Sequence, residues 1–242
     1  MRASLLIDDV HVPIKIKKEY RRNIRYSITG KSINVLIPKG LIGHSVESVV
    51  AEVKDWATME FKKKPSLLNR FRVIIYKNGE FIKVFGQDFQ LLIFMENRKG
   101  LSGKMATGNY IEIRAPQDAE QHLLHAAIGK LLSRVLSAHF HKDIVDRVQT
   151  FNQQFFQETI YTIRLKNNQS NWGSCSSKRN INLSSKLLLA PTPVLDYVIV
   201  HELAHLKEMN HSPKFWKIVR DIMPDYEKKE EWLKVYGHTL KY

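Results

Sequence analysis

The stretch that decides the fold is His201-Glu202-Leu203-Ala204-His205, followed by Leu206-Lys207-Glu208-Met209-Asn210-His211. Histidines four residues apart lie on one face of a helix, one turn apart, so their two imidazoles can bind a single metal ion. The glutamate beside the first histidine is then close enough to hold a metal-activated water. Short patterns of this kind also occur by chance, so the context has to carry the inference. The apolar run Tyr197-Val198-Ile199-Val200 just before the motif predicts a buried helix that forms the floor of a cleft.

A third ligand requires the chain to turn back after His205. On a continuous helix His211 would lie about 120° away from the face of the other two histidines. The sequence supplies a stop, because Asn210 tolerates the left-handed conformation that ends helices and Ser212-Pro213 is typical of a new helix start. We therefore predict that His211 is the third ligand. The rival ligands are carboxylates further along the chain: Asp221, Asp225 and Glu227.

The interval from His205 to His211 equals that of the metzincins, which have a glycine midway. Glu208 stands at that position here, so we expect the chain to turn later, near Asn210. The rival carboxylates lack the Glu-x-x-x-Asp arrangement on a helix that marks the gluzincins, which favours His211.

Three neutral imidazoles leave one coordination position of Zn²⁺ open for a water whose pKa is brought toward neutrality. We predict that His201, His205 and His211 bind Zn²⁺. Glu202 is predicted to take the proton as the water attacks a carbonyl or phosphoryl centre. An additional hydrogen-bond donor for the transition state has three candidates downstream, each with a simpler structural interpretation: Tyr226, Tyr236 and His238.

The composition is ordinary for a globular protein of 242 residues, with a hydrophobic fraction of 43%. No apolar run reaches the roughly 18 residues needed to span a bilayer, and the N-terminal apolar stretch is too short for a secretory signal. The single cysteine, Cys175, suits a reducing compartment, so we expect a cytoplasmic protein. The net charge of +14 favours polyanionic partners such as nucleic acid, although a lysine-rich solvated surface gives the same balance.

The first part of the chain shows mostly strand patterns. Residues 14–39 alternate apolar and basic residues around a Thr29-Gly30-Lys31 turn, which predicts a β-hairpin with a basic outer face. A helix is predicted from a Ser45 cap to Lys63, with Val46, Val49, Val53, Trp56 and Met59 inward. Further strands are predicted over residues 71–76, 81–85, 89–95 and 110–113, with a hairpin turn at Asn78-Gly79 and a loop over 100–108. We therefore expect a β-rich module over residues 1–115.

The period changes to helical after Pro116, which predicts a long helix over about 117–141. His122 and His125 lie three residues apart on it, and we interpret them as ordinary helix-face residues. Strands are predicted over 159–166, 179–183 and 186–189, before a helix capped by Thr192 with Pro193 at its first position. The whole is predicted to be an α+β protein with a zincin-like metallohydrolase domain over residues 116–242.

Taken together, these motifs resemble the YgjP-like family of metal-dependent hydrolases, in the zincin group that includes SprT-like and WLM proteases. The residues that carry the resemblance are Trp172-Gly173-Ser174-Cys175-Ser176, Asn180-Ile181-Asn182-Leu183, Pro191, Asp196-Tyr197-Val198, His201-Glu202-Leu203-Ala204-His205-Leu206, Asn210-His211-Ser212 and Phe215-Trp216, with Gly79-Glu80 and Gly86 as weaker motifs. The resemblance implies zinc on His201, His205 and His211 with Glu202 catalytic. The family also usually has an arginine where this chain has Asn171, and Lys166 or Lys178 could substitute for it. Cys175 is interpreted as a small packing residue outside the metal site.

Three functions remain open at this stage. The first is a zinc peptidase, in which the strand at Ile181 to Leu183 pairs with an extended substrate peptide. The second is a hydrolase of a phosphoanhydride such as a nucleoside triphosphate, which a cationic surface would suit. The third is a nucleic-acid-binding protein with a structural zinc, which has no need of Glu202 beside the metal.

Overall fold

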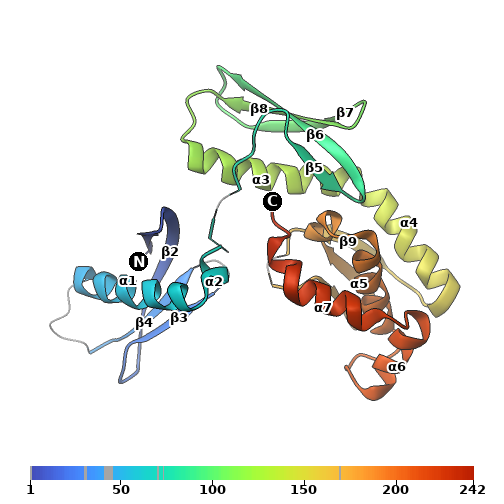
Figure 1. Cartoon of the computed structure of the whole chain (residues 1–242). Coiled ribbons are helices and arrows are strands. Elements are labelled where there is room, and N and C mark those ends of the chain that lie inside the picture. Colours follow the sequence, from blue (N-terminus) through green and yellow to red (C-terminus); the bar gives the residue numbers. More distant parts are fainter. Residues whose placement is uncertain (1, 30–31, 41–45, 70, 73, 169) are drawn as a thin grey trace. The chain divides into compact units, whose positions relative to one another are not determined.

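The computed structural model describes residues 2–29, 32–40, 46–69, 71–72, 74–168 and 170–242. The chain forms two compact units, Met1–Val73 and Ile74–Tyr242 (Figure 1). Each unit has its own hydrophobic core. Both units combine helices with mixed sheets, so the expected α+β class is confirmed. None of the described helices is long and apolar enough to cross a membrane.

The first unit is a four-stranded sheet with one helix on one face. Its strands run in the order β1-β2-β4-β3, and their bounds are β1 Arg2–Ile7, β2 Val10–Glu19, β3 Arg25–Ile28 and β4 Ile33–Pro38. Helix α1 (Val46–Lys63) buries Val49 and Val53 against Val12, Ile14, Ile33 and Val35 of the sheet, and α2 (Pro65–Asn69) follows. The alternation of buried and exposed residues along β2 is that of a sheet covered on one face only.

Most expectations for this unit are confirmed. β3 and β4 form the predicted antiparallel hairpin, and β4 also pairs in parallel with β2. Met59 was expected to face inward but is 56% exposed. The predicted turn at Gly30-Lys31 and the Ser45 cap lie outside the described residues.

The second unit begins with another four-stranded sheet, in the order β5-β6-β8-β7. The bounds are β5 Phe81–Val84, β6 Gln87–Glu96, β7 Ser102–Ala106 and β8 Tyr110–Pro116, and helix α3 (Gln121–His139) packs on one face. The division between the units therefore differs from the expected boundary at residue 115. Leu91, Ile111 and Ile113 of this sheet share one continuous core with Leu183 and Leu195, far along the chain, so the sheet belongs with the C-terminal part.

Three local expectations in this region were wrong. No strand forms over the described part of residues 71–76. Asn78-Gly79 is a turn, but the hairpin turn lies at Phe85-Gly86, where both residues have positive φ (50° and 78°). The predicted loop over 100–108 contains strand β7, which pairs with β8. Pairing of this kind is decided between segments and leaves a weak local signal.

The two sheets with their helices repeat one architecture, which we call module 1 (residues 2–63) and module 2 (residues 81–139). Both have an antiparallel first pair, a parallel central pair and an antiparallel last pair, followed by a helix. β2 begins at Val10 and β6 at Gln87, 77 residues later. The hairpin turns keep the same spacing, because Asp8-Asp9 (φ 46° and 61°) is matched by Phe85-Gly86. Buried residues correspond as well: Val12 with Phe89, Ile14 with Leu91, Ile33 with Ile111, Val49 with Leu124 and Val53 with Ile128.

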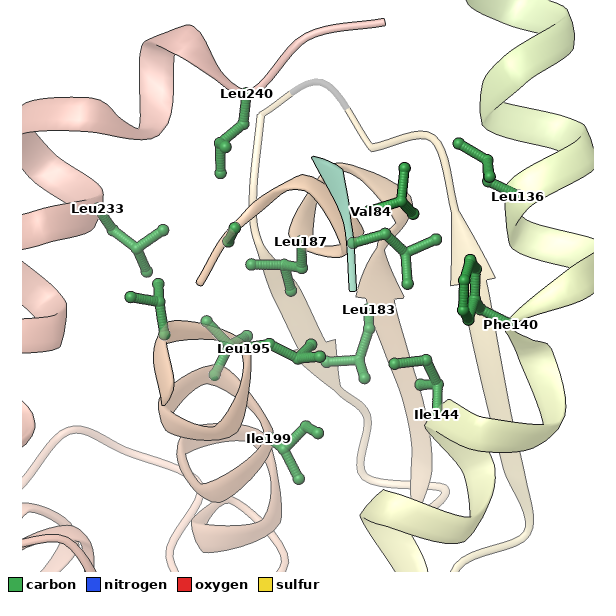
Figure 2. Close-up of a cluster of buried hydrophobic side chains, with 14 of the residues drawn as sticks. Val84, Leu136, Phe140, Ile144, Leu183, Leu187, Leu195, Ile199, Leu233 and Leu240 are labelled. Atoms are coloured by element: carbon green, nitrogen blue, oxygen red, sulfur yellow. The ribbon is translucent and has the colours of Figure 1, made fainter. Parts of the chain in front are cut away.

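The remainder of the second unit surrounds a small mixed sheet of order β10-β11-β9. Its elements are α4 (His141–Phe151), a π-helical turn (Asn152–Phe156), β9 (Thr162–Lys166), β10 (Gly173–Cys175), β11 (Asn180–Ser184), a 3₁₀ helix (Ser185–Leu189), α5 (Thr192–Ala204), α6 (Pro213–Ile222), α7 (Tyr226–Tyr236) and a final 3₁₀ turn (Gly237–Thr239). The strand expected over 186–189 is thus a 3₁₀ helix. Figure 2 shows Leu183, Leu187 and Leu195 at the centre of the core between α5 and the α3–α4 side.

Candidate metal centre

The centre is built on helix α5, which is almost fully buried. Its residues Val194, Leu195, Val198, Ile199, Val200 and Leu203 all belong to the core, as expected from the apolar run. The helix begins at Thr192 with Pro193 in its first turn, and Pro191 occupies the cap position that was assigned to Thr192. A two-pronged ion pair from Arg147 of α4 to Asp196 fastens the helix from one side. The motif therefore stands on a rigid, deeply anchored element.

The chain leaves the helical axis earlier than expected. Helix α5 ends at Ala204, with His205 as its C-cap, so the turn begins at the second histidine and not near Asn210. The Ser212 side chain accepts a hydrogen bond from the Phe215 backbone N–H (3.3 Å) and caps helix α6 as predicted. His211 thus stands just before the start of α6, at the corner between two helices.

This turn brings the three histidines together. Their ligand atoms all lie within 4.8 Å of one another, and this is the one such group of three among the described residues. The rival carboxylates do not join it: Asp221 pairs with Lys217 (2.6 Å) and Asp225 pairs with Lys229. The sequence prediction of which residues converge is therefore matched by the geometry.

The donor set fits a zinc ion. The Nε2 atoms of His201 and His211 lie 3.0 Å apart, so two ring nitrogens face the same point. The Nδ1–H of His205 donates a hydrogen bond to the Glu208 carbonyl oxygen (3.2 Å), and this tautomer leaves Nε2 for a metal. Burial, with the neighbouring histidines, lowers the pKa of His201 to about 3, and burial also lowers the pKa of His205. Both rings are therefore neutral near pH 7, which is the form that binds metal.

Helix α6 supplies an aromatic floor under the histidines. Phe215 is completely buried, and its ring centroid lies 4.9, 4.6 and 4.8 Å from those of His201, His205 and His211. Trp216 stacks on His211 at 5.6 Å with an interplanar angle of 23°. In the sequence, Phe215 and Trp216 stand out only as part of the resemblance to the YgjP-like family. Their task, holding three rings in one arrangement, depends on tertiary contacts that a pattern does not reveal.

Glu202 is 5% exposed and lies against strand β10. Its carboxylate accepts a hydrogen bond from the Cys175 backbone N–H, and a Cβ atom added to Gly173 would lie 2.5 Å from Glu202 Oε1. Burial raises the pKa of Glu202 to about 8, and the Cys175 N–H acts in the opposite direction. A carboxyl with such a pKa is suited to exchanging a proton near neutral pH. Gly173 is therefore a residue of the site that the sequence did not single out as such.

Strand β10 is an edge strand, and this corrects one expectation. β11, which contains Ile181 to Leu183, is paired on both sides and has no free edge for a substrate peptide. Two backbone groups at the ends of β10 bond to β11: the Trp172 carbonyl accepts from the Ser184 N–H, and the Ser176 N–H donates to the Asn180 carbonyl. The backbone groups of Trp172 and Ser176 therefore face β11. In an antiparallel ladder the intervening Gly173 and Cys175 turn their backbone groups to the other side. The free edge beside Glu202 is that of β10.

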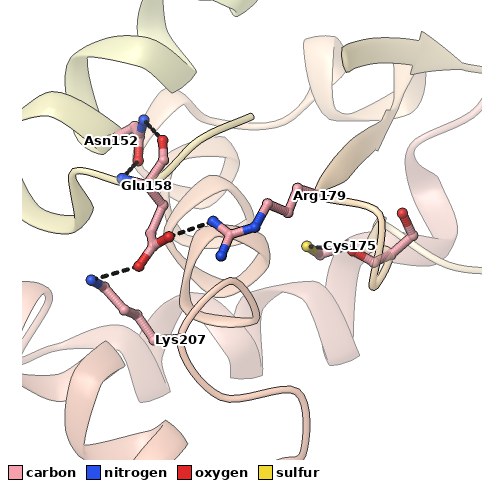
Figure 3. Close-up of polar contacts among 6 residues, drawn as sticks. Asn152, Glu158, Cys175, Arg179 and Lys207 are labelled. Atoms are coloured by element: carbon pink, nitrogen blue, oxygen red, sulfur yellow. Dashed lines mark hydrogen bonds and ion pairs between the residues drawn. The ribbon is translucent and has the colours of Figure 1, made fainter. Parts of the chain in front are cut away.

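A charged network stands next to the centre (Figure 3). Glu158 bonds to Arg179 and to Lys207 (2.7 Å), which follows the second histidine by two residues. Hydrogen bonds from Lys207 and then Arg179 lower the pKa of Glu158. The positive charge of Arg179 also acts on the thiol of Cys175, although burial and Glu202 raise the pKa of that thiol to about 11. Cys175 is thus a protonated thiol outside the histidine cluster, as expected.

Arg179 is a further candidate for the role of the arginine that the family usually has at the position of Asn171. Asn171 donates to the Gly173 carbonyl (2.9 Å), and Lys166 and Lys178 are exposed. Arg179 has a positive φ of 54° and is held by Glu158 with its side chain 40% exposed. Arg179 is therefore a cation held by an ion pair and close enough to Cys175 to act on its thiol, and its unusual backbone conformation has no signal in the sequence.

Other residues that the sequence singles out make packing contacts or hydrogen bonds within the fold. Tyr226 is buried and stacks on Trp216 (5.4 Å), while Tyr236 is 50% exposed and packs against Trp232. His125 is buried and its Nδ1 accepts a hydrogen bond from Tyr76 N–H (3.2 Å). The side chain of His122 lies outside the described part of the chain.

Searches of curated proteins and of solved structures found partial matches to this chain. The chain is 36% identical over 58 residues to the UTP pyrophosphatase of Escherichia coli K12, a match that covers 24% of this chain and 35% of that protein. Among solved structures, the metallopeptidase zymogen abylysin of Pyrococcus abyssi is 22% identical with a TM-score of 0.36, over 38% of this chain and 92% of that one. The zymogen jannalysin of Methanocaldococcus jannaschii is 28% identical with a TM-score of 0.34, over 39% and 94%.

The family comparison covers far more of the chain. The profile of the YgjP-like family, described as a metallopeptidase domain, matches residues 22–236 and so spans both compact units and the whole histidine centre. The chain belongs to the YgjP-like metallopeptidase-domain family.

Proposed function

We propose that the protein is a zinc-dependent peptidase in which His201, His205 and His211 hold the metal and Glu202 is the general base. The observation that carries the proposal is the convergence of the three histidine ligand atoms within 4.8 Å, with the buried Glu202 on the same helix. A purely structural zinc has no need of a buried carboxyl next to its first ligand. When bound, zinc would supply a water acidified to near neutrality and would polarise the bond under attack.

The protein's own groups then have distinct tasks. Glu202 accepts the proton of the attacking water and passes it to the leaving amine, a role that suits a carboxyl of raised pKa. The Cys175 N–H and the close approach of Gly173 fix the position of that carboxyl. Phe215 keeps the three histidine rings in place and excludes water from the side of the rings that it covers.

The free edge of β10 supports a peptide as substrate. An extended peptide can add to an exposed strand edge through backbone hydrogen bonds, independent of its side chains. Two backbone groups of that edge already have side-chain partners, because the Cys175 N–H donates to Glu202 and the Gly173 carbonyl accepts from Asn171 (2.9 Å). The Gly173 N–H and the Cys175 carbonyl are the groups left for a peptide. A peptide lying along β10 would therefore carry a carbonyl past the candidate base.

The alternative is hydrolysis of a nucleoside triphosphate phosphoanhydride. It is favoured by the relative named UTP pyrophosphatase, whose alignment covers about a third of that protein. Arg179 and Lys207 stand near the centre as cations suited to phosphate groups. In this case Glu202 keeps its role, and the two cations bind the substrate in place of the strand edge.

A substrate panel separates the two functions. The zinc-loaded protein is incubated with a library of unstructured peptides and with the common nucleoside triphosphates. Peptide cleavage without nucleotide turnover is the expected result, whereas nucleotide turnover without peptide cleavage would overturn the peptidase proposal. Arg179→Gln is the matched variant, since it should reduce nucleotide turnover at least tenfold and peptide cleavage by much less.

A further inference from the structure

The two repeated modules differ sharply on the sheet face that the helix leaves open. Lys15 and Lys17 of β2 and Arg25 of β3 point to that face in module 1, and we call these three residues the basic face. Pairing brings them together, because Lys17 lies opposite Leu36 and Leu36 lies opposite Arg25 across β2, β4 and β3. All three side chains are exposed.

Module 2 provides an internal control for this surface. At the same 77-residue spacing, Lys15, Lys17 and Arg25 correspond to Leu92, Phe94 and Ser102. The fold therefore does not require cations at these positions. Residues 2–39 contain nine Lys or Arg against three Asp or Glu, whereas the corresponding residues 79–116 contain five against four.

Cations on the strands of module 2 have acidic partners. Arg114 bonds to Glu96 (2.6 Å), and Lys104 lies 3.3 Å from Glu112. On the basic face only Lys17 has an ion pair among the described residues, with Glu19 at 2.8 Å. Lys15 and Arg25 are thus cations without a described counter-charge, which is the arrangement that attracts an external anion.

An exposed aromatic ring stands at the end of the same strand. Tyr20 directly follows β2 and is 89% exposed, and the Lys39 ammonium lies 3.9 Å from its ring centroid. The module 2 counterpart of Tyr20 is Asn97, so neither the exposure nor the aromatic character is imposed by the architecture. Proteins bind single-stranded nucleic acid through phosphates on cationic surfaces and through bases stacked on exposed aromatic rings. Module 1 has both kinds of group in β2 and the residue that follows it.

We propose that module 1 binds single-stranded nucleic acid, with phosphates on Lys15, Lys17 and Arg25 and a base stacked on Tyr20. The open surface is a sheet, and among the residues that the structure describes no helix projects from it to enter the major groove of a duplex. An acidic peptide would match the charge but would gain nothing from the exposed ring. This binding is independent of the proposed hydrolase activity, because no residue of the histidine centre takes part.

The test uses the full-length zinc-loaded protein and fluorescein-labelled 20-mers of oligo(dT) and oligo(U), titrated by anisotropy at several salt concentrations. The double variant Lys15→Glu/Arg25→Glu should bind at least tenfold more weakly, with a salt slope reduced by about 1.4, the value for two lost phosphate contacts on a single strand. Tyr20→Ala should weaken binding by about fivefold or more with an unchanged salt slope. Which oligomer binds more tightly distinguishes RNA from DNA as the natural ligand.

The control is Lys54→Glu/Lys62→Glu, which makes the same charge change on exposed positions of helix α1. It should keep the wild-type affinity within about threefold. Equal weakening by both double variants would overturn the proposal, because binding would then follow net charge alone. Absence of binding by the wild type would also overturn the proposal. A third contrary result is that poly-glutamate binds as tightly as the oligomers and Tyr20→Ala has no effect. Circular dichroism and zinc content verify that each variant is folded.

Discussion

The carboxyl of Glu202 and the α-carbon of Gly173 are in such close contact that a methyl group on Gly173 would lie 2.5 Å from Glu202 Oε1. The backbone of strand β10 and the candidate base are therefore fitted to each other. Cys175 N–H completes the arrangement by donating to the same carboxylate. This contact connects the strand edge that could bind a substrate to the group that would activate the water.

The first prediction follows from that contact. Gly173→Ala should displace the Glu202 carboxyl and reduce kcat/KM by about 100-fold, as expected for a shift of about 1 Å at a catalytic group. Zinc content should stay at the wild-type level, because the histidines are untouched. Gly100→Ala is the control, since nothing lies within 4 Å of a Cβ at that position. Equal activity of the two variants would contradict the role given to Gly173.

The second prediction concerns the third ligand. His211→Ala should lower zinc affinity at least about 100-fold, because loss of a ligand should cost at least as much as loss of an outer-shell partner. The exposed His141 provides the comparison, and His141→Ala should retain the wild-type affinity. Competition with a chromogenic chelator measures both. If the His211 variant holds zinc as firmly as the wild type, the third ligand lies elsewhere.

The third prediction concerns the corner between α5 and α6. Ser212→Ala removes the side chain that caps α6 and should lower the free energy of unfolding by about 1 kcal/mol. Urea unfolding followed by circular dichroism measures the change. Ser170→Ala, an exposed position in the same unit, should leave the value within about 0.5 kcal/mol. The same urea midpoint for both variants would contradict the role of Ser212 as a helix cap.

The fourth prediction tests where the chain divides. A fragment of residues 74–242 contains the complete core around the metal centre and should fold and bind zinc with the affinity of the full chain. A fragment of residues 116–242 loses Val84, Phe89, Leu91, Ile111 and Ile113 from that core. Removal of even one such side chain typically costs 2–5 kcal/mol, so this fragment should not fold. The opposite outcome would place the boundary near residue 115 after all.

The sequence revealed those parts of the protein that depend on neighbours along the chain. The spacing of His201 and His205, the apolar run before them and the Ser212-Pro213 helix start are all local patterns, and each matches the structure. The helix end at Ala204 came earlier than predicted, because His205 Nδ1 and the Glu208 carbonyl meet in the turn. The tolerance of Asn210 for a helix end gave no information about that contact.

The features that the sequence did not reveal are contacts between distant segments. The place of β5–β8 in the core of the second unit depends on residues a hundred positions apart, and so does the edge position of β10. The internal repeat is equally hidden, because the two modules share burial positions and turn geometry but few residue identities. Phe215 under the three histidines and Arg179 beside Glu158 belong to the same group of tertiary contacts.

The central claim is that Glu202 is the base of a zinc-dependent hydrolase, and the most direct test compares two zinc-loaded proteins. Glu202→Gln keeps the size of the side chain and its place beside Gly173 but cannot take a proton. Turnover of whichever substrate the wild type consumes should fall by a factor of 10² to 10⁴, with zinc content unchanged. Equal turnover by the wild type and Glu202→Gln, both fully loaded with zinc, would contradict the account.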